Sequence, residues 1–130
     1  MAVGILLVTH PGVGSALLDT ASRLLGRLPL EARAFDLAFD ADLTAQLPRA
    51  SAALKKVMGE DGALILTDVY GASPARLAHQ LTQIAAPCRR VAGLSLPMLL
   101  RVMNYGDQSL DDLARTAANG GRNGVVLDDA

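Results

Sequence analysis

The sequence predicts a doubly wound α/β fold, and three observations lead to that class. Two continuous apolar runs, Val3 to Val8 and Ala63 to Leu66, have the pattern of strands covered on both faces of a parallel sheet. Segments with apolar residues at helical spacing lie between the predicted strands. Strands and helices therefore alternate, which predicts a mostly parallel sheet with helices on both faces.

The length and composition favour one well-filled domain. The chain has 130 residues, of which 51% are hydrophobic and 19% charged, a balance typical of globular proteins rather than disordered ones. We therefore expect residues 1–130 to form a single domain. The net charge is -1 and aromatic residues make up 3% of the chain, which disfavours a nucleic-acid-binding surface.

The N-terminus and the cysteine count bear on location and redox chemistry. The run Ala2 to Val8 is too short to span a bilayer, and no Lys or Arg precedes it as in a signal peptide, so we expect a cytoplasmic protein without membrane insertion. Cys88 is the single cysteine, which excludes an intrachain disulfide and a cysteine-based metal site. Arg89 and Arg90 would favour its thiolate, but we interpret this lone cysteine as passive.

In the first half of the chain, the predicted elements follow from periodicity and proline positions. Leucine and alanine recur at helical spacing over residues 17–28, and Pro29 is expected to end that helix. Leu30 to Leu37 alternates apolar and polar residues, which predicts a half-exposed edge strand. A second helical face runs from Leu43 to Met58, and Pro48 within it predicts either a later start or a kink.

In the second half, capping signals and glycines mark the boundaries. Ser73-Pro74 predicts a helix start, with Ser73 as the cap. Val91 to Leu96 is expected to form a strand closed by Pro97, followed by a short helix over Met98 to Tyr105. Ser109 begins a capping box for the next helix, and Gly120-Gly121 is expected to stop it.

The last residues and the strand order complete the predicted fold. Gly124 to Leu127 is predicted to be a strand too short to be stable alone, so we expect it to join a sheet edge of its own protomer or of a partner. For the main sheet we predict the order 2-1-3-4, which makes the strand before His10 a neighbour of the strand before Asp68.

Polar residues at those two strand ends point to a reactive site. Ligands of such sheets bind beyond the carboxyl ends of the strands where the strand order reverses, so we expect His10 and Asp68 to face one another. A carboxylate on one imidazole nitrogen raises the basicity of the other nitrogen, as a nucleophilic histidine requires. Gly12 and Gly14 lie where the next helix presents free N–H groups, which predicts an anion site suited to phosphoryl transfer.

Gly71 and Ser73 add donors at the same rim, but each candidate also has a purely structural interpretation. In that interpretation, His10 is a loop residue whose ring nitrogens form hydrogen bonds with the backbone or water, and Ser73 is only a helix cap. Tyr70 is a rim aromatic that either packs or contacts a partner. We interpret His79 as a solvated helix residue rather than a metal ligand, because metal sites need converging ligands.

A dinucleotide site is the competing hypothesis. Gly12-x-Gly14-x-x-Leu17, with Asp36 near the end of the second strand, imitates the dinucleotide-binding fingerprint. Leu17 occupies the place of the third glycine, where close helix packing demands a small residue. The fingerprint fails at that position, and we expect neither a cofactor nor a metal.

Four motifs, taken together, resemble one bacterial family. They are Ile5-Leu-Leu-Val-Thr-His10, Asp68-Val-Tyr-Gly-Ala-Ser-Pro74, Gly93-Leu-Ser-Leu-Pro-Met-Leu99 and Gly120-Gly-Arg-Asn-Gly-Val125. In this order they cover essentially the whole chain, which resembles the IIA component of the mannose-type bacterial phosphotransferase system.

The resemblance implies that His10 accepts a phosphoryl group from the phosphocarrier protein HPr and passes it to a IIB component during sugar uptake. It implies that Asp68 orients the imidazole and that the segment from Gly71 to Ser73 lines the phosphate site. Pro11 stands where many relatives have glycine, and Tyr70 stands where some have tryptophan. Both residues are expected to face partners. A homodimer in which the last strand crosses to the partner's sheet is implied as well.

Two functions remain open within this family. We expect no IIB domain after residue 130, so the chain is either a transport subunit or a free-standing regulatory module. In the second case, the phosphorylation state of His10 controls a protein partner without sugar transport, because the added charge alters a docking surface.

Overall fold

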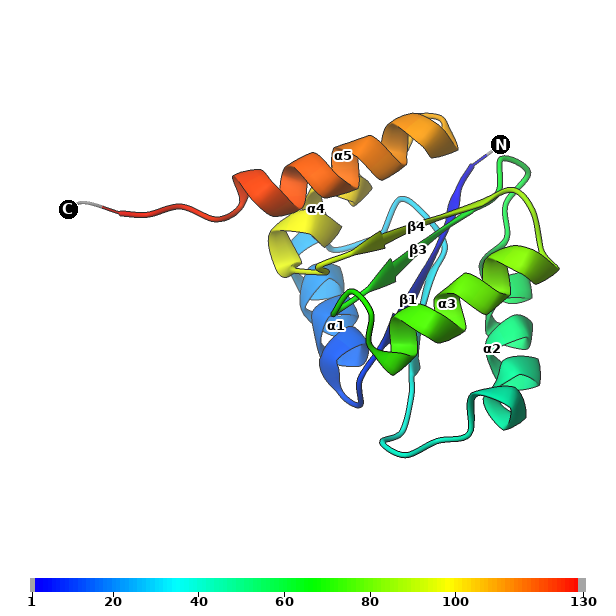
Figure 1. Ribbon diagram of the computed structural model, residues 1–130. Coiled ribbons are helices and arrows are strands. Elements are labelled where there is room, and N and C mark those ends of the chain that lie inside the picture. The colour runs from blue at the N-terminus through cyan, green and yellow to red at the C-terminus, as the bar shows by residue number, and fades with distance from the viewer. Residues whose placement is uncertain (1, 129–130) are drawn as a thin grey trace.

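A computed structural model describes residues 2–128 of the protein and shows strands and helices in alternation (Figure 1). The strands are β1 (Gly4–Thr9), β2 (Ala32–Asp36), β3 (Ala63–Thr67) and β4 (Cys88–Ala92). The helices are α1 (Val13–Leu25), α2 (Leu43–Val57), α3 (Ser73–Ile84), α4 (Leu96–Asn104) and α5 (Leu110–Asn123). Within residues 2–128, none of the helices is long and apolar enough to cross a bilayer.

The four strands form one parallel sheet in the order β2-β1-β3-β4, which confirms the predicted order. All residues of β1 and β3 are buried, as the continuous apolar runs predict, whereas β2 and β4 lie at the edges. The register pairs Val8 with Thr67, so the carboxyl ends of β1 and β3 lie together. The residues after these strands are therefore neighbours at the point where the strand order reverses.

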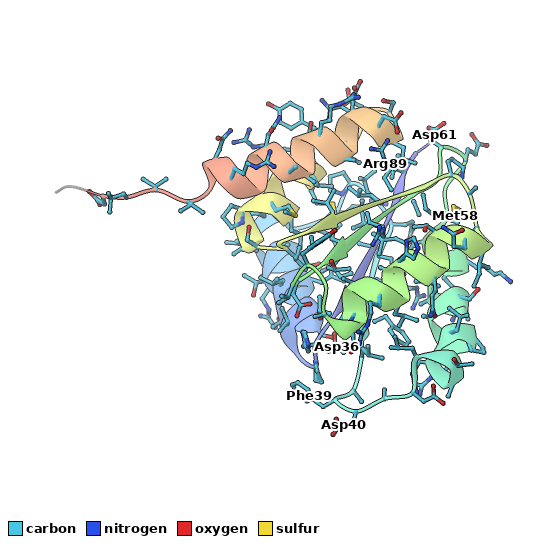
Figure 2. All side chains as sticks on the ribbon, viewed as in Figure 1. Asp36, Phe39, Asp40, Met58, Asp61 and Arg89 are labelled. Carbon is cyan, nitrogen blue, oxygen red and sulfur yellow. The ribbon has the colours of Figure 1, made fainter. Side chains whose placement is uncertain are left out.

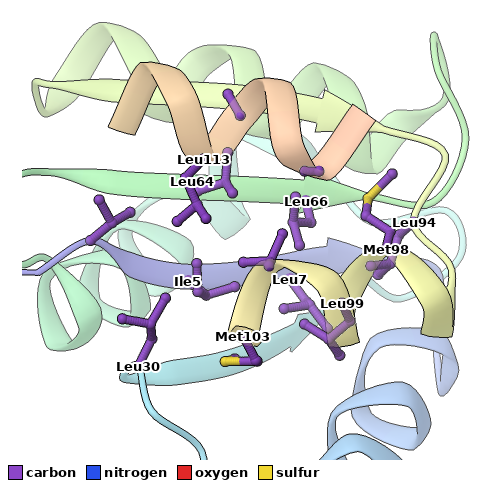
Figure 3. Packing of buried hydrophobic residues seen from close by; sticks show 14 of the residues in the cluster. Ile5, Leu7, Leu30, Leu64, Leu66, Leu94, Met98, Leu99, Met103 and Leu113 are labelled. Carbon is purple, nitrogen blue, oxygen red and sulfur yellow. The ribbon is translucent and has the colours of Figure 1, made fainter. Parts of the chain in front are cut away.

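Helices cover both faces of the sheet, and alternate side chains of β1 point to opposite faces. Leu7 packs in a cluster with residues of α1, α4 and α5, and Figure 3 shows it beside Leu66 and Leu99. Leu6 packs in a second cluster with residues of α2 and α3. The buried apolar area on both faces holds the strand ends rigidly in place.

Some boundaries differ from those predicted. β4 begins at Cys88 rather than Val91. Its first residues include exposed arginines, which an edge strand tolerates but which interrupt the apolar pattern that predicts a strand. Pro97 does not close a strand. It lies in the first turn of α4, where a missing N–H costs little, and Ser95 caps that helix by accepting from the N–H of Met98 at 3.2 Å.

Prolines and glycines also end the helices at other places than expected. α1 stops before Gly26, whose φ of 81° suits glycine, so Pro29 is not the terminator. α2 contains Pro48 and starts at Leu43, so the later start is wrong. α5 runs through Gly120-Gly121, because a Cβ at Gly120 would lie 2.8 Å from the Arg101 side chain and glycine permits close contact with α4.

The segment after α5 is not a strand of its own protomer's sheet. Residues 125–128 have no regular secondary structure and lead away from the body of the molecule (Figure 1). Val125, Val126 and Leu127 are 82%, 78% and 91% exposed. The alternative that this segment joins the sheet edge of its own protomer is wrong, because residues 125–128 pair with none of the strands that the structure describes.

Gly4 permits the close approach of β1 to the end of α2, and its substitution is expected to be costly. A Cβ at this position would overlap the carbonyl oxygen of Val57, a backbone atom that cannot move aside. We expect Gly4→Ala to lower the free energy of unfolding by about 1–3 kcal/mol or more, measured by urea denaturation. Gly121→Ala is the matched control, because its Cβ meets only the flexible end of Met98; an equal loss in both variants would contradict the assignment.

Candidate active site

His10 and Asp68 lie in contact at the carboxyl ends of β1 and β3, as the strand order predicts. The imidazole Nδ1 is 2.8 Å from Oδ2 of Asp68, and the backbone N–H of His10 donates to the same oxygen at 3.0 Å. An ionised carboxylate only accepts hydrogen bonds, so Nδ1 carries the proton. The Nε2 atom is left with its lone pair and has no hydrogen-bond partner within residues 2–128.

The surroundings of the pair keep Asp68 ionised. Its side chain is 10% exposed and that of His10 30% exposed. Burial alone would raise the pKa of Asp68, but hydrogen bonds from the backbone and ring of His10 outweigh it and lower the pKa below its ordinary value. The site therefore holds a carboxylate behind a half-exposed imidazole, the arrangement of a histidine that reacts through Nε2.

Thr9 shapes the loop that carries His10, a role that no pattern in the sequence predicts. Its side chain is fully buried, and its hydroxyl accepts from the N–H of Gly14 at 2.8 Å. The same hydroxyl donates to the carbonyl of His10 at 2.8 Å. Thr9 thus ties the first turn of α1 to the end of β1 and fixes the backbone on either side of the imidazole.

Replacing the hydroxyl of Thr9 by a methyl group is expected to destabilise this loop. Thr9→Val preserves the shape of the side chain but leaves the N–H of Gly14 buried without an acceptor. We expect a loss of about 1–3 kcal/mol in the free energy of unfolding, whereas Thr9→Ser should retain most of the stability. Equal stability of the Val and Ser variants in urea denaturation would show that the hydroxyl does not hold the loop.

Asp36, at the end of β2, accepts hydrogen bonds from donors of the loop that was expected to bind an anion. Its Oδ2 accepts from the backbone N–H of Gly12 at 2.9 Å and from the hydroxyl of Ser15 at 2.8 Å. With the N–H of Gly14 bound to Thr9, the start of α1 is largely satisfied within the protein. The expectation of an open anion site at this helix is wrong, and Asp36 is likewise not free for a ribose.

The start of α3 differs from the predicted cap. Ala72, not Ser73, is the N-cap residue, and no side chain caps the helix, whereas Pro74 lies in the first turn as expected. The hydroxyl of Ser73 instead accepts from Nη2 of Arg76 at 3.0 Å. Within residues 2–128, the N–H groups of Gly71 and Ser73 have no acceptor. This helix end therefore keeps the free donors that α1 lacks.

A pocket of about 220 Å³ brings His10 together with Ser73 and with the loop between β2 and α2. Phe39 and Asp40 line it from that loop, which lies beyond the strand end marked by Asp36 in Figure 2. The ring of Phe39 is 5.7 Å from the imidazole, centroid to centroid, and is 72% exposed. Asp40 has a φ of 60°, an uncommon conformation that often occurs at functional sites.

The remaining sequence candidates do not line the pocket of His10. Pro11 is exposed on the loop after His10. Tyr70 is 84% exposed, so it does not pack in the core. Gly71 has a φ of 84° and lines a neighbouring groove rather than the pocket of His10. His79 is exposed on α3 and lines that groove as well, which agrees with its interpretation as a solvated helix residue.

Cys88 is expected to react slowly. Burial raises the pKa of its thiol and outweighs a hydrogen bond with the backbone of Ala63, so the neighbouring arginines do not produce a thiolate. We expect the native protein to react with a disulfide reagent at pH 7.5 more slowly than the same protein in denaturant, with a rate that rises with pH. A native rate equal to the denatured one would contradict a passive Cys88.

The fold and the site define a doubly wound α/β protein with a histidine–carboxylate pair at the point where the strand order reverses. The chain matches the model of the mannose-type EIIA family, described as the PTS system fructose IIA component, over residues 4–117. It therefore belongs to this family of IIA components of the phosphotransferase system.

Individual relatives agree with this assignment. The chain is 29% identical over 127 residues to the PTS system mannose-specific EIIAB component of Escherichia coli (strain K12), covering 96% of this chain and 39% of that relative. The chain thus spans about two fifths of the curated relatives it matches.

Solved structures show the same fold. The mannose/sorbose-specific IIA subunit from Enterococcus faecalis superposes with a TM-score of 0.88 at 23% identity, over 100% of this chain and 97% of that one. The EIIA component from Streptococcus agalactiae gives 0.81 at 19% identity, over 96% of each chain.

Proposed function

We propose that the protein is a phosphocarrier, in which Nε2 of His10 accepts a phosphoryl group from HPr and passes it to a IIB component during sugar uptake. The observation that supports this most is the asymmetry of the imidazole. Nδ1 is held by Asp68 at 2.8 Å, whereas Nε2 is unengaged within residues 2–128 and the ring is 30% exposed. A protein donor can therefore reach the reactive nitrogen.

The proposed transfer needs no other reactant. The lone pair of Nε2 attacks the phosphorus of phosphorylated HPr, a new N–P bond forms on His10, and the N–P bond in HPr breaks with its electron pair returning to the HPr imidazole. Nδ1 keeps its proton throughout, so the ring of His10 gains positive charge. Asp68 lies where it stabilises that charge, and the reverse sequence delivers the phosphoryl group to IIB.

The start of α3 supplies the donors that we propose for the phosphoryl oxygens. The N–H groups of Gly71 and Ser73 are free within residues 2–128 and belong to a helix N-terminus, which favours anions. Because Arg76 donates to the oxygen of Ser73, the Ser73 hydroxyl can donate its own proton into the pocket. Gly12 contributes through its left-handed conformation, with φ 84°, rather than through its N–H.

The assembly proposed here is a homodimer in which residues 1–130 of each chain form a single domain. Val125, Val126 and Leu127 are exposed apolar residues outside the sheet, and β2 and β4 each leave one edge unpaired within residues 2–128. An exposed apolar segment and an open sheet edge are complementary, so we propose that residues 124–127 pair with the sheet of a partner. We place the protein in the cytoplasm with HPr, and Pro11 and Tyr70 at the surface that partners contact.

Reconstitution tests the function. The purified protein is incubated with radiolabelled phosphoenolpyruvate, enzyme I and HPr, and a purified mannose-type IIB domain is then added. We expect an acid-labile, base-stable label that moves from this chain to IIB. Absence of label would contradict the phosphocarrier, whereas a label that no IIB accepts would favour the regulatory module.

A further inference from the structure

A groove between α3 and the edge strand β4 lies beside the loop that contains Asp68. Its volume is about 480 Å³, and Tyr70, Arg76, His79, Gln80 and Arg90 contribute polar or aromatic side chains to its walls. None of the acidic residues within positions 2–128 lines it. Figure 1 shows α3 lying along the sheet next to β4, and the groove shares no lining residue with the pocket of His10.

The groove has two arginines whose charges the protein does not neutralise. Within residues 2–128, neither Arg76 nor Arg90 forms an ion pair, whereas the adjacent Arg89 pairs with Asp111 of α5 at 2.6 Å. Successive side chains of a strand point to opposite faces, which places Arg90 on the α3 side and Arg89 on the α5 side. Two exposed guanidinium groups that line the same groove attract carboxylates.

Uncharged groups of the groove are also left without partners. The Oε1 atom of Gln80 is buried and has no hydrogen-bond partner within residues 2–128. Tyr70 is 84% exposed, and Val69 beside it is 54% exposed. Tyrosine and arginine are enriched at the energetic centres of protein–protein interfaces, where they combine a large contact area with directional donors.

We infer that this groove docks an acidic segment of a partner protein, whose carboxylates pair with Arg76 and Arg90 while its backbone and apolar groups cover Tyr70 and Gln80. A small anion would pair with the arginines but leave the exposed Tyr70 of the groove uncovered. The inference goes beyond the proposed function and does not depend on phosphoryl transfer. It does place the docked segment next to the site, because Arg76 contacts Ser73 at the pocket of His10.

A peptide titration tests the docking site. The probe is a fluorescein-labelled decapeptide of alternating Glu and Ala, compared with its Lys and Ala counterpart, and binding is followed by fluorescence anisotropy and by amide shifts in ¹⁵N NMR spectra. We expect only the acidic peptide to bind, with shifts centred on Tyr70, Gln80 and Arg90. Arg90→Glu should weaken binding by about tenfold or more, because it places like charges together.

Arg49→Glu is the matched control, since Arg49 is exposed on α2, has no ion pair within residues 2–128, and undergoes the same charge reversal. It should change the affinity by less than about twofold, because Arg49 does not line the groove and salt screens exposed charges that are not in contact with the peptide. Equal weakening by both variants, or no binding of the acidic peptide, would overturn the inference. Displacement of the peptide by inorganic phosphate, added to the same concentration of negative charge as the peptide carries, would also overturn the inference and indicate a small-anion site.

The titration uses unphosphorylated protein without HPr or phosphoenolpyruvate. A negative result therefore refutes the docking groove and leaves the phosphocarrier proposal intact. Conversely, binding of the acidic peptide by a protein that HPr fails to label would refute only the phosphocarrier proposal.

Discussion

His10→Ala is expected to abolish phosphorylation of the protein by HPr. The substitution removes the nitrogen nucleophile, and among the described residues no other side chain that lines the pocket of His10 is a nitrogen base. Labelling from radiolabelled phosphoenolpyruvate, in the presence of enzyme I and HPr, should fall to background. The fold should survive, because the imidazole is partly exposed and contributes little to either apolar cluster.

His79→Ala is the matched control for this experiment. His79 is the other histidine of the chain, and it is exposed on α3 away from the pocket. This variant should be labelled at the rate of the unsubstituted protein. Persistent labelling of His10→Ala, or loss of labelling only in His79→Ala, would move the phosphorylation site away from the end of β1.

Asp68→Ala is expected to slow phosphoryl transfer by about 10- to 150-fold, because it removes a charge-assisted hydrogen bond worth about 1.5–3 kcal/mol to the charged ring of the transition state. The rate is measured by rapid-quench labelling with phosphorylated HPr. Asp68→Asn separates charge from position, since its amide oxygen can still accept from Nδ1. We expect the Asn variant to be slow as well, and unchanged rates in both variants would leave Asp68 as a turn residue.

The same carboxylate makes stability depend on pH in a defined direction. The pKa of Asp68 is lower in the folded protein than in the unfolded chain, so its contribution is fully present above the unfolded pKa. That contribution is lost as the pH falls through the lower, folded pKa. The difference in unfolding free energy between the native protein and Asp68→Asn should therefore shrink in acid, and a constant difference would contradict a stabilising role of the ionised carboxylate.

The central part of the fold was predictable because its signals are local. β1 and β3 are continuous apolar runs, and burial on both faces of a parallel sheet produces that pattern directly. β4 was placed too late because its first residues include exposed Arg89 and Arg90, which an edge strand accepts. Gly120-Gly121 gave a stop signal that helix–helix packing against Arg101 overrides.

The candidate site was only partly predictable, since several contacts join distant segments. Asp68 was found because polarity at a strand end and the strand order together place it beside His10. Asp36 obeys the same strand-end rule at the end of β2, which places its carboxylate beside the backbone N–H of Gly12. Phe39 has no such signal, because its position depends on the course of the loop after β2.

The phosphorylated nitrogen is the most direct test of the proposed mechanism. The protein is labelled by HPr, and ³¹P and ¹⁵N NMR spectra identify the atom that is bonded to phosphorus. Because Asp68 holds Nδ1 at 2.8 Å, we predict a phosphoryl group on Nε2 of His10. A phosphoryl group on Nδ1 of His10, or on any other residue, would contradict the proposal that Asp68 holds one nitrogen so that the other can react.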